Sequence, residues 1–242
     1  MKIYAGIDDT DSLEQGATGQ SANELRRIIK EKGWGSTEPV TRHQLLLHPD
    51  IPYTSHNSSM CFTADISADK LDEFIACAAE FLKTTSAPGS DPGLGVAVSE
   101  RIKNVEHLLS FGFKTKIEVV SKEEAYQTAR YCGIHLSEHG GTGQGVIGAL
   151  AGIALRMTGN DGRFQGKTNL KDVGQTMGIG EILASTEIDE VQTMEGYVLP
   201  ENETLIIGDK IKTVLLDGKR KLLVYREEDG WHTCNNKQLK NY

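Results

Sequence analysis

The sequence lacks the features of a disulfide-stabilised or zinc-binding domain. Its four cysteines occur singly, without a CxxC pair, and are Cys61, Cys77, Cys132 and Cys234. Because zinc ribbons and small secreted scaffolds need grouped cysteines, we expect reduced thiols instead. No apolar run approaches the roughly 20 residues of a membrane-spanning helix, and no basic and apolar leader precedes the first strand-like segment. The sequence therefore predicts a cytoplasmic protein without a membrane partner.

Positive charge is also scarce, which limits the classes of binding partner. The chain has 26 Lys and Arg against 34 Asp and Glu, a formal net charge of -8. Proteins that bind a polyanion usually carry a clustered basic surface. The densest basic group surrounds a predicted hairpin and consists of Lys210, Lys212, Lys219, Arg220 and Lys221. We interpret it as an exposed strand face, so we expect the chain alone to bind nucleic acid weakly.

An acidic loop near the N-terminus is the feature around which we expect the chain to be organised. Asp8, Asp9 and Asp11 directly follow the strand-like run 2–7. Carboxylates this close together repel one another unless a cation or hydrogen-bond donors lie among them. Mg²⁺ prefers such hard oxygen ligands and usually shares them with substrate phosphates. The three acids are therefore the predicted metal ligands.

A loop of small residues, 16–21, links the acids to an amphipathic helix expected at 22–31. Backbone amides at a helix start can bind phosphate. Nucleotide contacts are therefore expected from Thr10, Ser12, Thr18 and Gly19. Acids for Mg²⁺ followed by such a loop are the parts of a nucleoside-triphosphate site. The alternative is an Asx turn with a helix cap, because Asp, Thr and Ser form both structures.

A second glycine-rich loop, 137–145, precedes an apolar helix expected at 146–157. Its glycines let backbone amides approach an anion closely, and the helix start adds to the attraction. The candidate contacts are His139, Gly141, Thr142, Gly143 and Gly145. The loop has neither the Gly-Lys-Ser/Thr of a Walker loop nor the spacing of a Rossmann fingerprint. Glycine for helix packing is the alternative interpretation.

Two other places carry isolated candidates. His56 and Asn57 lie in a polar loop broken by proline, where they could bind phosphate or a small substrate, although a lone loop histidine is commonly only solvated. Asp91 lies in the turn Ser90-Asp91-Pro92-Gly93 and is either an acid supporting the metal site or a purely structural turn residue. The sequence alone leaves both alternatives open.

Periodicity predicts an α+β protein with mixed sheets and packed helices, followed by a small antiparallel β module. Helices are expected at 22–31, 67–82, 105–111, 122–132 and 146–157. Strands are expected at 2–7, 40–47, 60–66, 96–98, 193–198, 205–207, 213–216 and 222–225. Asp217-Gly218 and Asp229-Gly230 are the predicted hairpin turns. We therefore expect a region of mixed strands and helices at 1–160, which carries the candidate nucleotide site, and a mainly β region at 161–242.

Four motifs resemble the archaeal agmatidine synthetase family, ATP-dependent enzymes that join agmatine to a wobble cytidine of a transfer RNA. They are Gly6-Ile7-Asp8-Asp9-Thr10-Asp11-Ser12 with Thr18, His48-Pro49-Asp50-Ile51-Pro52-Tyr53, Asp91-Pro92-Gly93, and Gly143-Gln144-Gly145-Val146-Ile147-Gly148-Ala149-Leu150-Ala151. Their order is the family's order. The chain departs from the family at Ser55-His56-Asn57-Ser58, which replaces a basic stretch, and the C-terminal part matches much less well. Neither the nucleic-acid-binding module nor the zinc ribbon of full-length synthetases is recognisable.

The resemblance implies a kinase-like catalytic region with ATP and Mg²⁺ as cofactors, in an enzyme of the ligase type that functions in transfer-RNA processing. It implies that Asp8, Asp9 and Asp11 are catalytic metal ligands and that Thr18 accepts a phosphate. Because the binding modules for transfer RNA are missing, we expect a small-molecule substrate, with a carbonyl group phosphorylated or activated for coupling to an amine. The alternatives are a transfer-RNA-modifying ligase acting with partners and a non-catalytic nucleotide- or anion-binding protein. The oligomeric state is open, with a homodimer among the alternatives.

Overall fold

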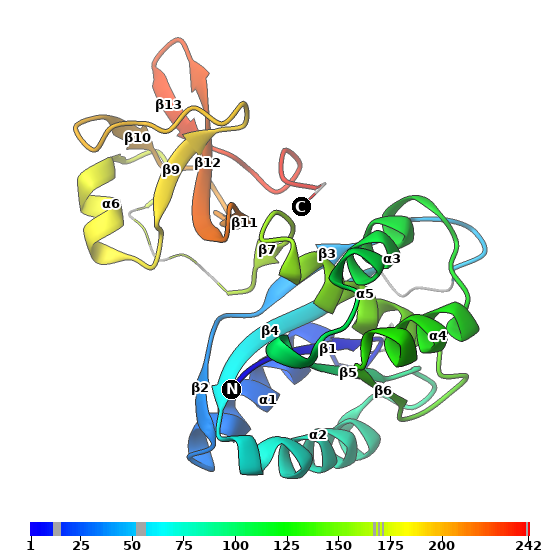
Figure 1. The fold of residues 1–242 in the computed structure, drawn as a ribbon. Helices are drawn as coiled ribbons and strands as arrows, with labels where there is room; N and C mark the ends of the chain where they lie inside the picture. The colour runs from blue at the N-terminus through cyan, green and yellow to red at the C-terminus, as the bar shows by residue number, and fades with distance from the viewer. Residues whose placement is uncertain (12–15, 52–56, 167, 169, 171, 241) are drawn as a thin grey trace. The chain divides into compact units, whose positions relative to one another are not determined.

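The computed structural model describes residues 1–11, 16–51, 57–166, 168, 170, 172–240 and 242 (Figure 1). They form two compact units, Met1–Thr158 and Gly159–Tyr242, which we call the N-terminal unit and the C-terminal unit. The predicted class, α+β with packed helices and a small β module, is confirmed. Within these described ranges, no helix has the length and apolar character needed to cross a membrane.

The N-terminal unit is built on an antiparallel sheet with strand order β6-β5-β1-β4-β3, and β2 pairs with β4. Its strands are β1 (Lys2–Asp8), β2 (Gly35–Thr37), β3 (Thr41–Gln44), β4 (Ser58–Ile66), β5 (Gly93–Val98) and β6 (His135–Glu138). Strand β1 lies between β5 and β4, and its residues Ile3, Ala5, Gly6 and Ile7 are buried. Asp8 at its end pairs with Gly93, and Gly93 pairs in turn with Glu138. The ends of three strands therefore meet at one edge of the sheet.

Helices cover both faces of this sheet (Figure 1). They are α1 (Thr18–Glu31), α2 (Leu71–Thr85), α3 (Val105–Ile117), α4 (Lys122–Cys132) and α5 (Gly145–Met157), with 3-10 turns at Ala68–Lys70 and Ser99–Arg101. Helices α1 and α2 bury Leu25, Ile29 and Phe74 against one face. Helices α3, α4 and α5 pack on the other face around Leu108 and Leu150. This three-layer arrangement fixes the direction of α1 and α5, which both begin near the sheet edge that carries Asp8.

Helix α5 approaches the sheet unusually closely because glycines line the contact. A Cβ on Gly6 would overlap the carbonyl oxygen of Ala149, and a Cβ on Gly93 would overlap the backbone of Gly145. A larger residue at either position would push the helix away from the strands. The paired glycines therefore place the first turn of α5 directly against the ends of β1 and β5.

Most elements predicted for the N-terminal unit are confirmed, and α4 has the predicted bounds. Helix α1 begins at Thr18, four residues before the predicted start at 22, because the loop residues 18–21 already adopt helical geometry. Strand β3 ends at Gln44, short of the predicted 47. Strand β6 was not predicted, because its four residues do not alternate between apolar and polar side chains. Its pairing comes from β5, whose start at Gly93 also precedes the predicted 96.

The C-terminal unit is mainly β, with strand order β7-β11-β12-β13-β10-β8 and β9 paired to β12. Its elements are β7 (Arg163–Phe164), β8 (Thr176–Gly178), α6 (Ile179–Ser185), β9 (Glu190–Thr193), β10 (Thr204–Ile206), β11 (Val214–Leu216), β12 (Lys219–Glu227) and β13 (Gly230–Thr233). A core that includes Ile182, Leu205 and Leu222 holds α6 against these strands. Two of the pairings, β10 with β13 and β9 with β12, are parallel, so the module is mostly rather than wholly antiparallel.

One strand prediction in the C-terminal unit is wrong, and one of the two predicted hairpin turns is confirmed. The other is shifted by one residue: the chain turns at Glu228-Asp229 instead of Asp229-Gly230, because Gly230 already pairs as the first residue of β13. The segment 193–198 was expected to be a strand, but β9 ends at Thr193 and the chain turns through Gly196, which has a φ of 93°. At the first hairpin, Asp217 and Gly218 have φ values of 53° and 72°, as a two-residue type I′ turn requires. The second hairpin joins β12 to β13 and places Glu227 opposite Gly230.

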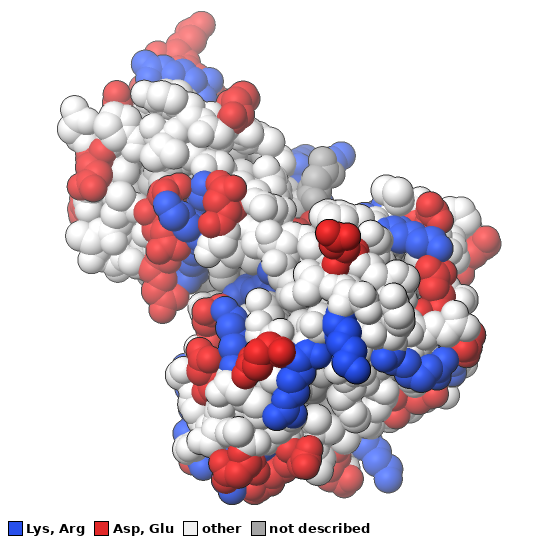
Figure 2. Space-filling model, viewed as in Figure 1, with Lys and Arg blue, Asp and Glu red and all other residues white. Residues whose placement is uncertain are grey.

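The basic group of the C-terminal unit is largely neutralised within the unit. Lys219 pairs with Glu190, Arg220 with Glu187, and Lys221 with both Glu190 and Asp217. Interpreting the group as an exposed strand face is wrong for Lys221, whose side chain is only 4% exposed. The face in Figure 2 likewise shows Lys and Arg interspersed with Asp and Glu. Neighbouring acids reduce the attraction of such a surface for a polyanion.

Candidate active site

The candidate site lies at the sheet edge where β1 ends, β5 begins and α5 begins. Asp8 is the last residue of β1, and the amide of Gly145 at the start of α5 donates to the Asp91 carbonyl oxygen at 3.1 Å. Short connections from these ends bring Asp9, Asp11 and Asp91 to the same edge. Sequence segments more than 80 residues apart therefore contribute acidic residues to one place in the fold.

The carboxylate of Asp8 lies against the first turns of α5. A Cβ on Gly148 would overlap the Asp8 carboxylate, so glycine is required there for the contact to exist. Burial raises the pKa of Asp8 well above its ordinary value, and the charge of neighbouring Asp9 raises it further. The amide of Asp9 donates to this carboxylate and works in the opposite direction. A buried acid with a raised pKa is energetically unfavourable as an anion unless a cation accompanies it.

Asp9 occupies a tight turn between Asp8 and Thr10. Its φ is 53°, a left-handed conformation that Asp tolerates better than most residues. Burial raises the pKa of Asp9 to about 6, with further contributions from the negative charges of Asp91 and Asp11. In the described part of the chain, no Lys, Arg or His forms an ion pair with Asp8 or Asp9. As far as the described residues go, Asp8 and Asp9 therefore concentrate negative charge without a basic side chain paired to either.

Asp11 and Thr18 form a hydrogen-bonded pair at the start of α1. The Thr18 hydroxyl donates to Asp11 Oδ1 at 2.5 Å, and the Thr10 amide donates to Thr18 Oγ1 at 3.3 Å. Thr10 is itself held by Ser21, with 3.1 Å between the two hydroxyl oxygens. A hydroxyl that donates to a carboxylate has the arrangement of a nucleophile beside a general base. Thr18 is thus placed for proton transfer to Asp11.

The three acids of the loop do not converge on a single point. In the described residues, the only three His, Cys, Asp or Glu side chains with ligand atoms within 4.8 Å of one another are Glu227, Asp229 and His232. Asp8 turns toward Gly148, Asp11 turns toward Thr18, and Asp9 lies near Asp91. That Asp8, Asp9 and Asp11 bind a metal stays a prediction, and their side chains point in different directions in this structure. Mg²⁺ sites with only one or two protein carboxylates and substrate phosphates remain compatible with it.

The second glycine-rich loop is fixed by Asp91. The Thr142 hydroxyl donates to Asp91 Oδ2 at 2.6 Å, and the Thr142 amide donates to Oδ1. Gly141 has a φ of 54° and lies so close to the Asp91 carboxylate that a Cβ would overlap it. Both polar groups of Thr142 are consequently engaged by the protein, so Thr142 shapes the loop instead of offering a free donor. Asp91 is a loop anchor as well as an acid beside Asp9.

Glu138 holds the other side of this loop and was missed as a candidate. Lys122 Nζ donates to Glu138 Oε2 at 3.0 Å and to the Thr142 carbonyl oxygen at 2.8 Å. The Tyr126 hydroxyl donates to Glu138 Oε1 at 3.2 Å. Gly143, with a φ of 78°, passes so close that a Cβ would overlap Glu138. No sequence pattern connects Lys122 with Glu138, because α4 and β6 meet only in the folded chain.

Backbone donors remain at both helix starts. Neither Ala17 before α1 nor Gln144 before α5 makes a side-chain capping bond. In the glycine-rich loop, the amides of Gly141, Gly143 and Gln144 have no acceptor among the described residues. Gly145 was a candidate contact, but its amide is taken by Asp91. Free amides at a helix start attract anions, so this edge combines phosphate donors with carboxylates.

The remaining predicted residues have mixed outcomes. The His139 ring contacts the Ser137 hydroxyl at 2.9 Å, and burial lowers the pKa of His139. The side-chain amide of Asn57 donates to the Leu46 carbonyl oxygen at 2.7 Å, and this hydrogen bond holds the segment that follows β3. Gly19 is buried in the first turn of α1. Ser12 and His56 lie outside the described residues.

The raised pKa of Asp9 predicts a pH-dependent stability. Near pH 4 the carboxyl ionises in the unfolded chain, whereas in the folded chain it keeps its proton up to about pH 6. The folded state binds more protons in that window, so its stability falls as pH rises from 4 to 6 and then levels off. Asp9→Asn should therefore gain about 1–2 kcal/mol over the wild type across this range, after allowance for solvent screening.

Thermal unfolding between pH 4 and 8 without divalent ions would measure this difference. Asp65→Asn is the control, because Asp65 is exposed in β4 of the same sheet. A constant difference between Asp9→Asn and the wild type over the whole pH range would contradict the prediction. Added Mg²⁺ should stabilise the wild type above pH 6 more than Asp9→Asn.

Comparison with known proteins relates this fold to a transfer-RNA-modifying enzyme. No protein-family model matches the chain. The uncharacterized protein MJ0921 of Methanocaldococcus jannaschii is 32% identical over 158 residues, covering 64% of this chain and 50% of that protein. The crystal structure of TiaS in complex with its transfer RNA and ATP matches with a TM-score of 0.55 and 25% identity, over 64% of this chain and 36% of that chain. The crystal structure of apo TiaS, a transfer-RNA agmatidine synthetase, matches with a TM-score of 0.53 and 24% identity, over 64% of this chain and 35% of that chain.

The chain shares the agmatidine synthetase fold over 64% of its length. The TiaS chain in that complex is bound to transfer RNA and ATP. The chain spans about half the length of the curated relative and about a third of the solved TiaS chains. The likeness therefore concerns the fold of part of those proteins.

Proposed function

We propose that this protein is an Mg²⁺-dependent, ATP-using enzyme related to the agmatidine synthetases, and that it transfers phosphate through a kinase-like site. The hydrogen bond from Thr18 to Asp11 carries the proposal, because it places a hydroxyl nucleophile and a base beside two carboxylates that have no ion-pair partner among the described residues. A loop that served only as a turn would not explain why the pKa values of Asp8 and Asp9 are raised. Nor would it explain why two helix starts lack a side-chain cap. Together these groups supply the positioning and charge neutralisation that phosphoryl transfer requires.

Asp8 and Asp9 are the residues that would hold Mg²⁺. Their raised pKa values arise from burial and mutual repulsion, which a divalent ion would relieve. Bound Mg²⁺ would neutralise charge on the nucleotide phosphates. Asp91 lies close enough to add to the negative potential at Asp9, while its own carboxylate is occupied by Thr142. We assign Asp11 to Thr18 instead of to the metal.

The free amides at the helix starts would contact the phosphates. Gly141, Gly143 and Gln144 form one group and the first turn of α1, with Gly19, forms the other. Their positive φ values allow Gly141 and Gly143 to direct backbone N–H groups that a side chain would obstruct. Carboxylates beside these donors would repel a bare phosphate, so binding should require Mg²⁺ along with ATP.

Thr18 is the proposed phosphate acceptor. Its Oγ1 would form a bond to the γ-phosphorus while the bond from that phosphorus to the β–γ bridging oxygen breaks. Asp11 would take the hydroxyl proton, and ADP would leave. Burial of Thr18 at 6% exposure keeps competing water away from the same phosphorus. The phosphate could then pass to a substrate carbonyl and activate it for attack by an amine.

A phosphorylation assay tests this assignment. Incubation of the purified chain with γ-labelled ATP and Mg²⁺ should label Thr18, and Thr18→Val should lose the label. Asp11→Asn should label about 100-fold more slowly, because general bases typically contribute about 10²–10⁴-fold. Thr18→Ser is the matched control and should still be labelled. Equal labelling of Thr18→Val, or labelling without divalent metal, would contradict the proposed role.

A small molecule is the proposed substrate, with transfer RNA as the second candidate. The likeness to a TiaS complex that contains transfer RNA favours transfer RNA. The net charge of -8 and the ion-paired basic group argue against tight binding of any polyanion by this chain alone. Measuring ATP turnover with metabolite fractions and with total transfer RNA would separate the two substrate classes.

Transfer-RNA binding by the isolated chain should be weak. Non-specific nucleic-acid affinity depends on clustered Lys and Arg, and dedicated binders reach only about 10⁻⁴–10⁻⁶ M at physiological salt. We expect this chain to lie at or beyond the weak end of that range. An anisotropy titration with total transfer RNA, Mg²⁺ and ATP would measure it. Saturable submicromolar binding that weakens steeply with salt would show that transfer RNA is the substrate class.

A further inference from the structure

The tip of the β12–β13 hairpin carries a second group of potential metal ligands. Tyr225 pairs with His232 across the two strands, and Glu227 pairs with Gly230 next to the turn. Because alternate strand residues share a face, Tyr225, Glu227 and His232 project on the same side of the hairpin. Asp229 belongs to the connecting turn. The two-residue connection therefore brings Glu227, Asp229 and His232 together at the tip.

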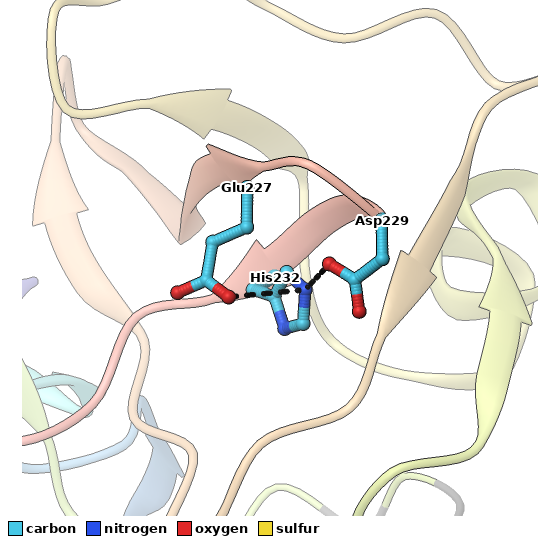
Figure 3. A group of neighbouring side chains, drawn as sticks. All are labelled: Glu227, Asp229 and His232. Carbon is cyan, nitrogen blue, oxygen red and sulfur yellow. Dashed lines mark hydrogen bonds and ion pairs between the residues drawn. The ribbon is translucent and has the colours of Figure 1, made fainter.

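The ligand atoms of these three side chains surround the imidazole (Figure 3). His232 Nε2 lies 2.7 Å from Asp229 Oδ1 and 3.8 Å from Glu227 Oε2. All three ligand atoms lie within 4.8 Å of one another. Their side chains come from both strands and the turn, and they enclose the Nε2 atom from two sides. This spacing allows one ion to contact all three after small side-chain rotations.

Neighbouring aromatic residues hold the group in place. The Tyr225 and His232 rings lie 5.6 Å apart between centroids, and the Tyr225 hydroxyl hydrogen-bonds Glu227. On the other face of the hairpin, Arg226 lies over the Trp231 ring at 4.9 Å. Arg226 is thereby directed away from the acids. The imidazole orientation is set before any ion binds, which lowers the cost of ordering the site.

The acids of this hairpin are paired differently from Glu187 and Glu190 of the same unit. Glu187 and Glu190 each pair with a Lys or Arg. Among the residues that the structure describes, Glu227 and Asp229 form ion pairs only with His232. With a neutral imidazole the group carries two uncompensated negative charges. A divalent cation would neutralise both, which a protonated histidine cannot do alone.

We propose that Glu227, Asp229 and His232 bind a divalent transition-metal ion of the Zn²⁺ type at the hairpin tip. An imidazole nitrogen with two carboxylate oxygens suits Zn²⁺, Co²⁺ or Ni²⁺, whereas Mg²⁺ and Ca²⁺ prefer all-oxygen ligand sets. Three protein ligands would leave at least one coordination position for water, which can reach the ion because both carboxylates are mostly exposed. For a neutral imidazole to bind the ion through Nε2, the proton now shared with Asp229 would move to Nδ1, so the ring would stay neutral. The ion would link the two strands beside the turn that connects them.

This inference is independent of the proposed ATP chemistry. The ligands all belong to the C-terminal unit, while the acid loop and both glycine-rich segments belong to the N-terminal unit. Loss of ATP use would leave the hairpin site unaffected. Conversely, a variant of His232 should bind ATP as the wild type does, so failure of one proposal is distinguishable from failure of the other.

Calorimetric titration of the full chain with Zn²⁺, in excess Mg²⁺ to occupy the acid loop, tests the site directly. We expect one saturable Zn²⁺ site, weakened at least tenfold by His232→Ala and by Asp229→Asn. The matched control is His107→Ala, since His107 also contacts a tyrosine ring, that of Tyr131, but has no ion-paired acid among the described residues. Co²⁺ should quench the fluorescence of adjacent Trp231 in the wild type and not in Asp229→Asn.

If His232→Ala folds poorly, variants of the exposed residues Glu227 and Asp229 still test the site. Glu227→Gln and Asp229→Asn alter solvent-facing side chains and should leave the circular dichroism spectrum unchanged. Saturable Zn²⁺ binding that both variants weaken would establish the site. Absence of saturable binding, or the same affinity in both folded variants as in the wild type, would overturn it and leave an ordinary surface ion pair.

Discussion

Asp8→Asn is expected to weaken Mg²⁺-dependent ATP binding at least tenfold, about 1.4 kcal/mol, and to leave the folded chain at least as stable near pH 7. The loss of affinity follows from removal of a proposed metal ligand. The equal or higher stability expected of Asp8→Asn follows from the raised pKa of Asp8. A buried carboxylate without a cation opposes folding above the pH at which it ionises, and Asn removes that charge. Asn keeps an oxygen that can accept the Asp9 amide. Function and stability should thus change in opposite directions.

Calorimetry with ATP in the presence and absence of Mg²⁺, combined with thermal unfolding, measures both effects. Asp65→Asn is again the control, because Asp65 is exposed and remote from the sheet edge that carries Asp8. Unchanged ATP affinity in folded Asp8→Asn would remove Asp8 from the metal site. A large loss of stability near pH 7 would instead show that the carboxylate is held by favourable contacts.

Local sequence signals located the acid loop but not the directions of its side chains. The alternation of Ile3, Ala5 and Ile7 predicts a buried strand, and the following acids predict a charged strand end. Whether Asp8, Asp9 and Asp11 share one ion depends on contacts with Gly148 and Thr18, which come from other elements. Such contacts have no periodicity in the sequence. The residue types at this strand end were therefore predictable, and the directions of their side chains were not.

Long-range pairing also explains what was missed around the second glycine-rich loop. The sequence of β6, His135-Leu136-Ser137-Glu138, has a single apolar residue and therefore does not predict a strand. The strand forms because it pairs with β5. Its last residue, Glu138, then reaches Lys122 of α4. In the C-terminal unit, Glu190 reaches Lys221 in the same way and buries a charge that the local sequence marks as exposed.

Gly145→Ala is expected to abolish detectable ATP binding and to destabilise the N-terminal unit by about 1–3 kcal/mol, the range for overpacked contacts. A Cβ there would overlap the Asp91 carbonyl oxygen and lie 2.8 Å from the Gly93 nitrogen and 3.0 Å from the Asp8 carbonyl oxygen. These are backbone atoms of two adjoining strand ends and cannot rotate away. Helix α5 would have to retreat, breaking the 3.1 Å hydrogen bond from the Gly145 amide.

Retreat of α5 would separate the phosphate donors of the second loop from Asp8, which is why the effect on ATP should exceed the effect on stability. Gly178→Ala is the matched control, since Gly178 also precedes a helix, has a φ of -69°, and offers a Cβ open space. Urea unfolding and ATP calorimetry on both variants measure the difference. If Gly145→Ala unfolds at the wild-type urea midpoint and keeps its ATP affinity, the close approach of α5 to β1 and β5 does not build the site.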